Sequence, residues 1–151
     1  MKNSIKPQGC TNLKLRQLTR MVTRHYDGYI AETGLKNTQY ALLSYVVRLG
    51  PIQPVDLSRL MRMDASTLTR NLQPLATQGL LEIGAGKDAR SRLVEATEAG
   101  RMKQAEGQRA WKTAQTVLNE RLGVERVVAL HDLLDTCIEY LDSHPDEPSG
   151  K

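Results

Sequence analysis

Residues 56–100 read DLSRLMRMDASTLTRNLQPLATQGLLEIGAGKDARSRLVEATEAG, and this stretch decides the fold. Asp64 is a good helix N-cap, so it predicts a break between one helix over 55–61 and another over 65–78. The second half predicts two short strands, 80–83 and 92–95, around a Gly-rich, charged tip. Two helices, a tight turn and then a hairpin form the pattern of a winged helix-turn-helix.

Two helices are expected before this stretch, over residues 11–33 and 39–49, because apolar residues recur there at three- and four-residue steps. Thr11 or Asn12 is the expected N-cap of the first helix, and Thr38 that of the second.

Two helices are also expected after it, over 98–122 and 124–141, with Thr97 capping the first. Residues 143–151 are polar and are expected to form a disordered tail. Pro74 lies inside the helix 65–78 and predicts a kink or a local loosening there. The chain is therefore predicted to be one domain of a mainly helical (α+β) class.

The composition indicates a soluble globular protein, with 151 residues, 25% charged residues and a net charge of +4. The charge is uneven: residues 1–50 carry +6, residues 51–97 carry +1 and residues 98–151 carry −3. Any nucleic-acid contact in the winged stretch must therefore depend on where a few Arg and Lys lie, because its bulk charge is small. With no membrane-length apolar run and no secretory signal, we expect a cytoplasmic protein that spans no membrane.

Enzymatic and metal-binding motifs are missing from the sequence, so we expect no catalytic residue, metal or cofactor. His25, His131 and His144 lack the spacing of metal ligands. Cys10 and Cys137 lie far apart and predict two reduced thiols, with Cys137 packed on an apolar helix face.

The helix 65–78 is interpreted as a recognition helix because six residues with polar side chains fill its N-terminal half: Ser66, Thr67, Thr69, Arg70, Asn71 and Gln73. Four of these (66, 69, 70 and 73) share one face of the helical wheel. Arg can bind guanine, and Asn or Gln can bind adenine, by paired hydrogen bonds in the major groove. An ordinary solvated polar face is the alternative interpretation.

The hairpin tip carries a second set of candidates. Asp88 and Arg90 are two residues apart, so a carboxylate could hold an arginine that enters a minor groove. Lys87 and Arg92 would bind phosphates, which position a protein without reading sequence. A polar turn with a surface ion pair is the alternative.

The stretches STLTRNLQPLATQGLLE and DARSRLVEATEAG resemble the MarR family of bacterial winged-helix regulators. The family pattern is Asp-x-Arg at the wing followed by Leu-Thr-x-x-Gly at the start of a long helix. Asp88, Arg90, Thr97 and Gly100 match this pattern, and Ala96 stands where Leu is usual. The resemblance covers roughly residues 11–141 in the order of the elements.

This resemblance implies a DNA-binding lobe over 38–97 and a homodimer held by helices in 11–34 and 98–142. It also implies a repressor that binds a pseudo-palindromic double-stranded operator. Release from the operator would follow binding of a small effector, often an anionic aromatic molecule such as an aromatic carboxylate.

Candidate effector contacts lie on the first helices: Arg16, Arg20, His25, Tyr26 and Tyr45. A buried Arg could bind a carboxylate at two points, and Tyr rings could enclose an aromatic ring. The basic residues could instead form a solvated face, or pair with acidic residues of the partner's last helix.

Two other functions stay open. Peroxide-sensing relatives carry a reactive Cys near the start of the first helix, so Cys10 raises a thiol-based redox sensor, although the matching position here is Asn12. The chain could also be a helical protein-interaction module that does not read DNA.

Overall fold

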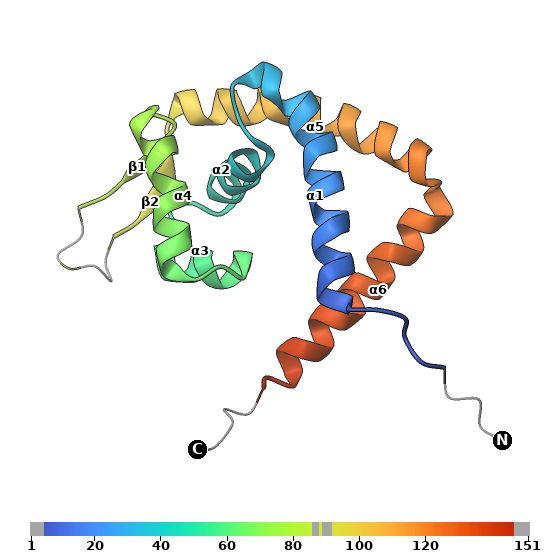
Figure 1. The fold of residues 1–151 in the computed structure, drawn as a ribbon. Helices are drawn as coiled ribbons and strands as arrows, with labels where there is room; N and C mark the ends of the chain where they lie inside the picture. Colours follow the sequence, from blue (N-terminus) through green and yellow to red (C-terminus); the bar gives the residue numbers. More distant parts are fainter. Residues whose placement is uncertain (1–4, 86–87, 89–91, 147–151) are drawn as a thin grey trace. The chain divides into compact units, whose positions relative to one another are not determined.

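The computed structural model describes residues 5–85, 88 and 92–146 (Figure 1). In chain order the elements are α1 (Thr11–Ile30), the 3-10 helix η1 (Ala31–Thr33), α2 (Asn37–Leu49), α3 (Pro54–Met61), α4 (Ala65–Thr77), β1 (Leu81–Ile83), β2 (Val94–Ala96), α5 (Glu98–Leu122) and α6 (Val124–Ser143). The chain separates into two compact units, Met1–Ala114 and Gln115–Lys151.

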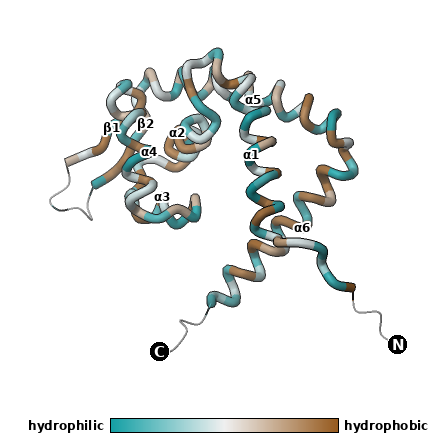
Figure 2. Tube along the Cα trace, in the orientation of Figure 1, coloured by the Kyte–Doolittle hydropathy of each residue, from teal (hydrophilic) through white to brown (hydrophobic). Residues whose placement is uncertain are grey.

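The core of the first unit lies between α2, α3, α4 and the hairpin. It consists of buried aliphatic side chains from each of these elements, among them Leu42, Leu43, Val46, Leu57, Leu68, Leu72, Leu75 and Val94. Apolar and polar positions alternate along the helices (Figure 2), and none in the described part of the chain is long and apolar enough to cross a membrane. These helices are amphipathic and pack through one face.

The hairpin is a short antiparallel pair in which Leu81 lies opposite Ala96 and Ile83 opposite Val94. Ile52 adds an isolated bridge: its N–H donates to the Val94 carbonyl at 3.0 Å, and the Val94 N–H donates back at 2.8 Å. The predicted strand boundaries were too early, because β1 begins at Leu81 and β2 covers Val94–Ala96.

The predicted caps of α1 and α2 were wrong. Cys10 is the N-cap residue of α1 and makes no side-chain cap bond. At the start of α2, Asp27 Oδ1 accepts the Asn37 N–H at 2.7 Å, and Gln39 Oε1 accepts the Lys36 N–H at 2.9 Å. The donors at this helix end are thus bound by other side chains, and Thr38 lies inside the first turn.

Pro74 leaves α4 unbroken. The helix continues to Thr77, and the Gln78 N–H donates to the Pro74 carbonyl at 3.1 Å. Pro74 itself is exposed on the helix surface. The expected kink therefore does not divide the helix.

Three residues fix the start of α5 to the winged helix-turn-helix. Thr97 Oγ1 donates to the Gly79 carbonyl at 2.6 Å and accepts the Gly100 N–H at 3.0 Å, which confirms Thr97 as the N-cap.

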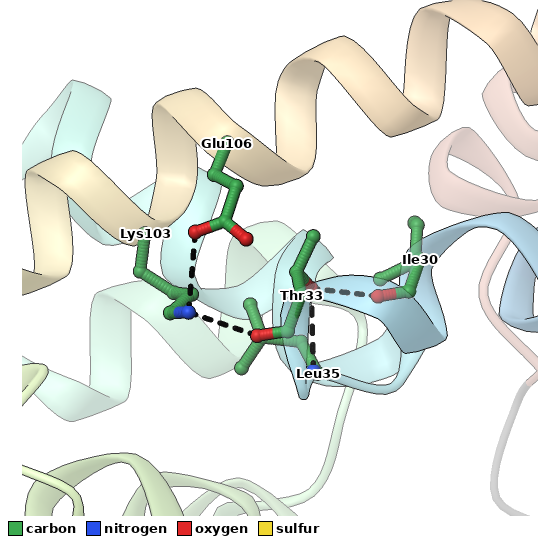
Figure 3. A network of polar contacts seen from close by, with 5 residues as sticks. All are labelled: Ile30, Thr33, Leu35, Lys103 and Glu106. Carbon is green, nitrogen blue, oxygen red and sulfur yellow. Dashed lines mark hydrogen bonds and ion pairs between the residues drawn. The ribbon is translucent and has the colours of Figure 1, made fainter.

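Further along α5, Lys103 Nζ donates to the Thr33 carbonyl at 2.9 Å and pairs with Glu106 at 3.2 Å (Figure 3). The turn after α1 is thereby tied to α5.

The second unit contains the end of α5 and the helix α6. α6 ends at Ser143, so the predicted tail began too early, and residues 147–151 lie outside the described part of the chain. Cys137 is exposed, not packed as expected. Large apolar side chains are also exposed along α6, including Val128, Leu133, Ile138 and Leu141.

Candidate nucleic-acid interface and ligand cavity

The exposed face of α4 carries four of the six predicted recognition residues: Ser66, Thr69, Arg70 and Gln73. Leu68, Leu72 and Leu75 on the opposite face are buried, so packing against the core determines which face of α4 is exposed. Two of the four have oriented hydroxyls, since Thr69 Oγ1 donates to the Ala65 carbonyl and Ser66 Oγ to Asp64. The result is a rigid helix that presents a polar surface.

Asp64 organises the N-terminal end of this surface. Its Oδ1 accepts Ser66 Oγ and the Thr67 N–H, both at 2.7 Å, and its Oδ2 accepts Thr67 Oγ1 at 3.0 Å. These bonds, that from Ser66 foremost, lower the pKa of the Asp64 carboxyl to about 2. Asp64 is therefore the charged N-cap that the sequence predicted.

Thr67 and Asn71 are half-buried and turn toward the helix-turn-helix itself. Thr67 donates to Asp64 through both its N–H and its hydroxyl. Asn71 Nδ2 donates to Met63 Sδ at 3.8 Å. In this arrangement the two side chains brace the turn between α3 and α4, while the other four predicted residues face outward.

The wing is described in part. Asp88 and Arg92 are exposed, as a contact with a nucleic acid would require. Lys87 and Arg90, the other two predicted wing residues, lie outside the described residues. The β1–β2 ladder extends one step beyond the strands, because the Gly84 N–H donates to the Leu93 carbonyl at 2.8 Å.

A cavity of about 450 Å³ lies between α1, α2 and α5 within the first unit. It is lined mainly by aromatic and polar side chains: Tyr26, Asn37, Tyr40, Ala41, Ser44, Tyr45, Arg48, Gln108 and Trp111. Arg48 lies over the Tyr45 ring, with its Cζ 5.1 Å from the ring centroid. Burial raises the pKa of the Tyr26 phenol, so this hydroxyl is neutral at physiological pH. The cavity offers aromatic walls and one cation.

The predicted ligand residues fall in different places. Tyr26 and Tyr45 line this cavity, whereas Arg16 and Arg20 line a separate hollow on α1 with Leu15 and Thr19.

His25 bridges α1 and α5, since its Nε2 donates to the Ala114 carbonyl at 2.8 Å. Its ring also contacts the rings of Tyr26 and Tyr29. These contacts give His25 a structural role beside the cavity.

Sequence reasoning missed Arg48 and Trp111. A signal for Arg48 was present, because it follows Tyr45 by three residues and so shares a helix face with it. Trp111 could not be found this way, since it reaches the cavity from α5, more than sixty residues further along the chain.

Cys10 is exposed immediately before α1. Among the described residues, no three His, Cys, Asp or Glu side chains are grouped as a metal site requires.

Known proteins resemble this chain in sequence and in fold. The sequence pattern described as "MarR family" matches residues 33–91. The uncharacterized HTH-type transcriptional regulator YwoH of Bacillus subtilis is 24% identical over 93 residues, which are 62% of this chain and 68% of YwoH.

Two solved structures extend the likeness to most of the chain. The M. tuberculosis transcriptional regulator MosR in complex with DNA is 28% identical, with a TM-score of 0.69 over 85% of this chain and 98% of the other. A probable transcriptional regulator from Pseudomonas aeruginosa is 29% identical, with a TM-score of 0.74 over 85% and 96%.

The fold is thus the MarR-type winged helix, with the small hairpin after the recognition helix. The MarR family consists of transcriptional regulators and not of enzymes. The sequence match over residues 33–91, together with the fold shared over most of the chain, makes this protein similar in sequence and in structure to the MarR family.

Proposed function

We propose that this protein is a cytoplasmic, homodimeric repressor of transcription that binds a pseudo-palindromic DNA operator and is released by a small ligand. The observation that carries the DNA-binding part is the outward face of α4, with Ser66, Thr69, Arg70 and Gln73 exposed on a helix that is buried on its other side. An exposed row of hydrogen-bonding side chains on a rigid helix is what a major groove requires. The similar MosR structure in complex with DNA supports the same role.

In this proposal each part of the interface has its own task. Arg70 and Gln73 contact base edges, while Thr67 and Asn71 hold the helix-turn-helix in shape. Lys87 and Arg92 bind phosphates at the wing, and Asp88 orients Arg90 toward a minor groove.

The proposal of a dimer is supported by large apolar side chains that are exposed to solvent in a single protomer. Leu13 and Leu15 on α1 are 53% and 44% exposed, and Leu133 and Leu141 on α6 are each 65% exposed. Exposed large apolar groups in such numbers favour burial against a second chain. Two-fold symmetry would then place two copies of α4 on half-sites about 10 bp apart.

The test of DNA reading begins with selection of bound duplexes from a random pool by the purified protein. Anisotropy then compares the selected duplex with a scrambled one. Arg70→Ala should weaken binding to the selected duplex about 5- to 150-fold, equivalent to about 1–3 kcal/mol. Arg109→Ala, an exposed arginine on α5, is the control and should bind like the unchanged protein.

Equal affinity for selected and scrambled duplexes would reject specific reading and would favour the protein-interaction module. A wild-type affinity of Arg70→Ala would reject the role of Arg70 alone.

The effector proposal rests on the cavity between α1, α2 and α5. Its aromatic walls suit a flat ring, and Arg48 supplies a guanidinium that can bind a carboxylate at two points. Tyr40 belongs to both the cavity and the buried core, so a ligand there would contact a residue that packs against the DNA-binding helices. The ligand would change DNA affinity by binding one arrangement of the dimer more tightly than the other.

Trp111 makes the cavity observable, because it is the one tryptophan in the sequence and it lines the wall. Benzoate titrated against the protein should change its fluorescence, and neutral benzamide should bind more weakly. Arg48→Gln should remove the preference for benzoate, whereas Arg20→Ala should keep it, because Arg20 lines the other hollow. An equal response of Arg48→Gln and the unchanged protein would remove Arg48 from the site.

A further inference from the structure

Arg62 has a backbone conformation that is unusual for its residue type. Its φ is 51° and its ψ is 43°, in the left-handed region, and among the described residues other than glycine no other has a positive φ. It ends α3, where its N–H points to the carbonyls of Ser58 and Arg59. The next N–H, of Met63, donates to the Ser58 carbonyl at 2.9 Å. These bonds hold Arg62 in this conformation.

Glycine is the usual residue at such a position, because a Cβ makes the left-handed conformation unfavourable. Burial in the core does not account for the arginine, since Arg62 is exposed to solvent. A residue kept in an unfavourable conformation without burial is a reason to look for a function of its side chain.

The position of Arg62 indicates what that function is. The residue lies in the turn between α3 and α4, two residues before the N-cap of the recognition helix. Met63 beside it is half-buried and accepts a hydrogen bond from Asn71, which ties the turn to α4. A side chain on this turn therefore keeps a fixed relation to the exposed face of α4.

Charge in this region depends on Arg62. From Pro54 to Thr77 the chain has three arginines (59, 62 and 70) and two aspartates (56 and 64), so its net charge is +1. Loss of Arg62 would make the helix-turn-helix neutral. DNA affinity depends strongly on the neutralisation of phosphates. A single cation in this nearly neutral region therefore contributes a large share of its electrostatic attraction to DNA.

We propose that Arg62 is a positioning residue that binds a phosphate of the DNA backbone beside the groove entered by α4. The inference rests on the proposed DNA-binding function and adds a contact outside the recognition face and the wing. A phosphate contact from the turn would fix the register of α4 on the duplex without reading a base. Arg62 would then matter for every duplex sequence to a similar degree.

Arg62→Gly is the informative variant, because it removes the guanidinium and also removes the Cβ that makes the left-handed conformation unfavourable. The melting temperature should stay the same or rise. Affinity should fall several-fold for both the selected and the scrambled duplex, and the slope of log affinity against log salt should become shallower by about 0.9, as for the loss of one phosphate contact. Arg62→Lys should keep most of the affinity and the slope.

Arg59→Ala is the matched control, one turn earlier on α3 and paired with Asp56 at 3.4 Å. The slope of log affinity against log salt for Arg59→Ala should equal that of the unchanged protein. An unaltered slope in Arg62→Gly, or a loss confined to the selected duplex, would overturn the phosphate contact. Absence of salt-dependent duplex binding by the unchanged protein would instead reject the proposed function, so the two failures are distinguishable.

Discussion

Gly100 lies directly against the carbonyl of Leu80, so close that a Cβ on Gly100 would overlap the Leu80 oxygen. The same oxygen accepts the Thr97 N–H at 3.1 Å. The first turn of α5 therefore rests on the backbone that joins α4 to β1. This contact explains in physical terms why glycine follows Thr97 by three residues.

Gly100→Ala should destabilise the protein strongly. A helical glycine replaced by alanine normally gains up to about 1 kcal/mol of helix propensity. Here the new methyl group meets backbone, which cannot rotate away, so overpacking should cost about 3 kcal/mol or more. Urea denaturation measures the difference.

Gly28→Ala is the control, because a Cβ there meets nothing within 4 Å. It should leave stability unchanged or raise it. Equal stability of the two variants would mean that α5 does not pack on Leu80 as described.

Gly107→Ala should have a milder effect on stability and a larger one on the cavity. A Cβ at Gly107 would lie 2.6 Å from Cδ2 of Tyr40, and this ring, unlike the Leu80 backbone, can move. The expected loss is about 1–2 kcal/mol, since the clash is partly relieved and helix propensity is gained. Because Tyr40 lines the cavity, Trp111 fluorescence should change as well. Unchanged fluorescence would contradict the contact between Gly107 and Tyr40.

The order of the elements could be predicted from the sequence because local signals determine it. Asp64 and Thr97 cap α4 and α5 as predicted, since each is followed by donors at fixed spacing. Thr38 misled the prediction because Asp27, ten residues before Asn37, accepts the Asn37 N–H at the start of α2. The ring of Tyr40 lies against Gly107, although the two residues are far apart in the sequence. Contacts distant in sequence leave no local pattern.

The candidate site was predictable to the extent that it lies on one helix. Helical periodicity separated Ser66, Arg70 and Gln73 from the buried leucines, and the structure places them on the exposed face. The cavity was not predictable in the same way, because it joins three helices. Arg20 was a predicted effector contact but lines a separate hollow, whereas Arg48 is the arginine beside Tyr45.

Asp64 should make stability depend on pH in the acid range. Its pKa is lowered from 3.8 to about 2, first by the bond from Ser66 and then by those from Thr67. A lowered carboxyl pKa contributes stability that is fully present above the ordinary value and is lost as pH falls toward the folded value. Asp64→Ala should therefore be less stable than the unchanged protein at pH 6, and the gap should narrow as pH falls from about 4 toward 2.

Melting temperatures across this range would measure the gap, with Asp146→Ala, in the segment after α6, as the control. A gap of constant size between pH 6 and pH 2 would contradict the charged cap.

Lys103→Met should weaken the connection between η1 and α5. Lys103 Nζ donates to the Thr33 carbonyl, and Thr33 is buried, with its Oγ1 donating to Ile30 and accepting the Leu35 N–H (Figure 3). Loss of the ammonium leaves that carbonyl without this charged donor, which should cost about 1–2 kcal/mol. Glu106→Gln is the comparison, because it removes the ion pair and keeps the bond to Thr33, and a half-exposed pair contributes about 0–1 kcal/mol. Hydrogen exchange at the Leu35 amide should accelerate in Lys103→Met and not in Glu106→Gln. Equal destabilisation by the two variants would assign the effect to the ion pair. The hydrogen bond to Thr33 would then contribute no stability of its own.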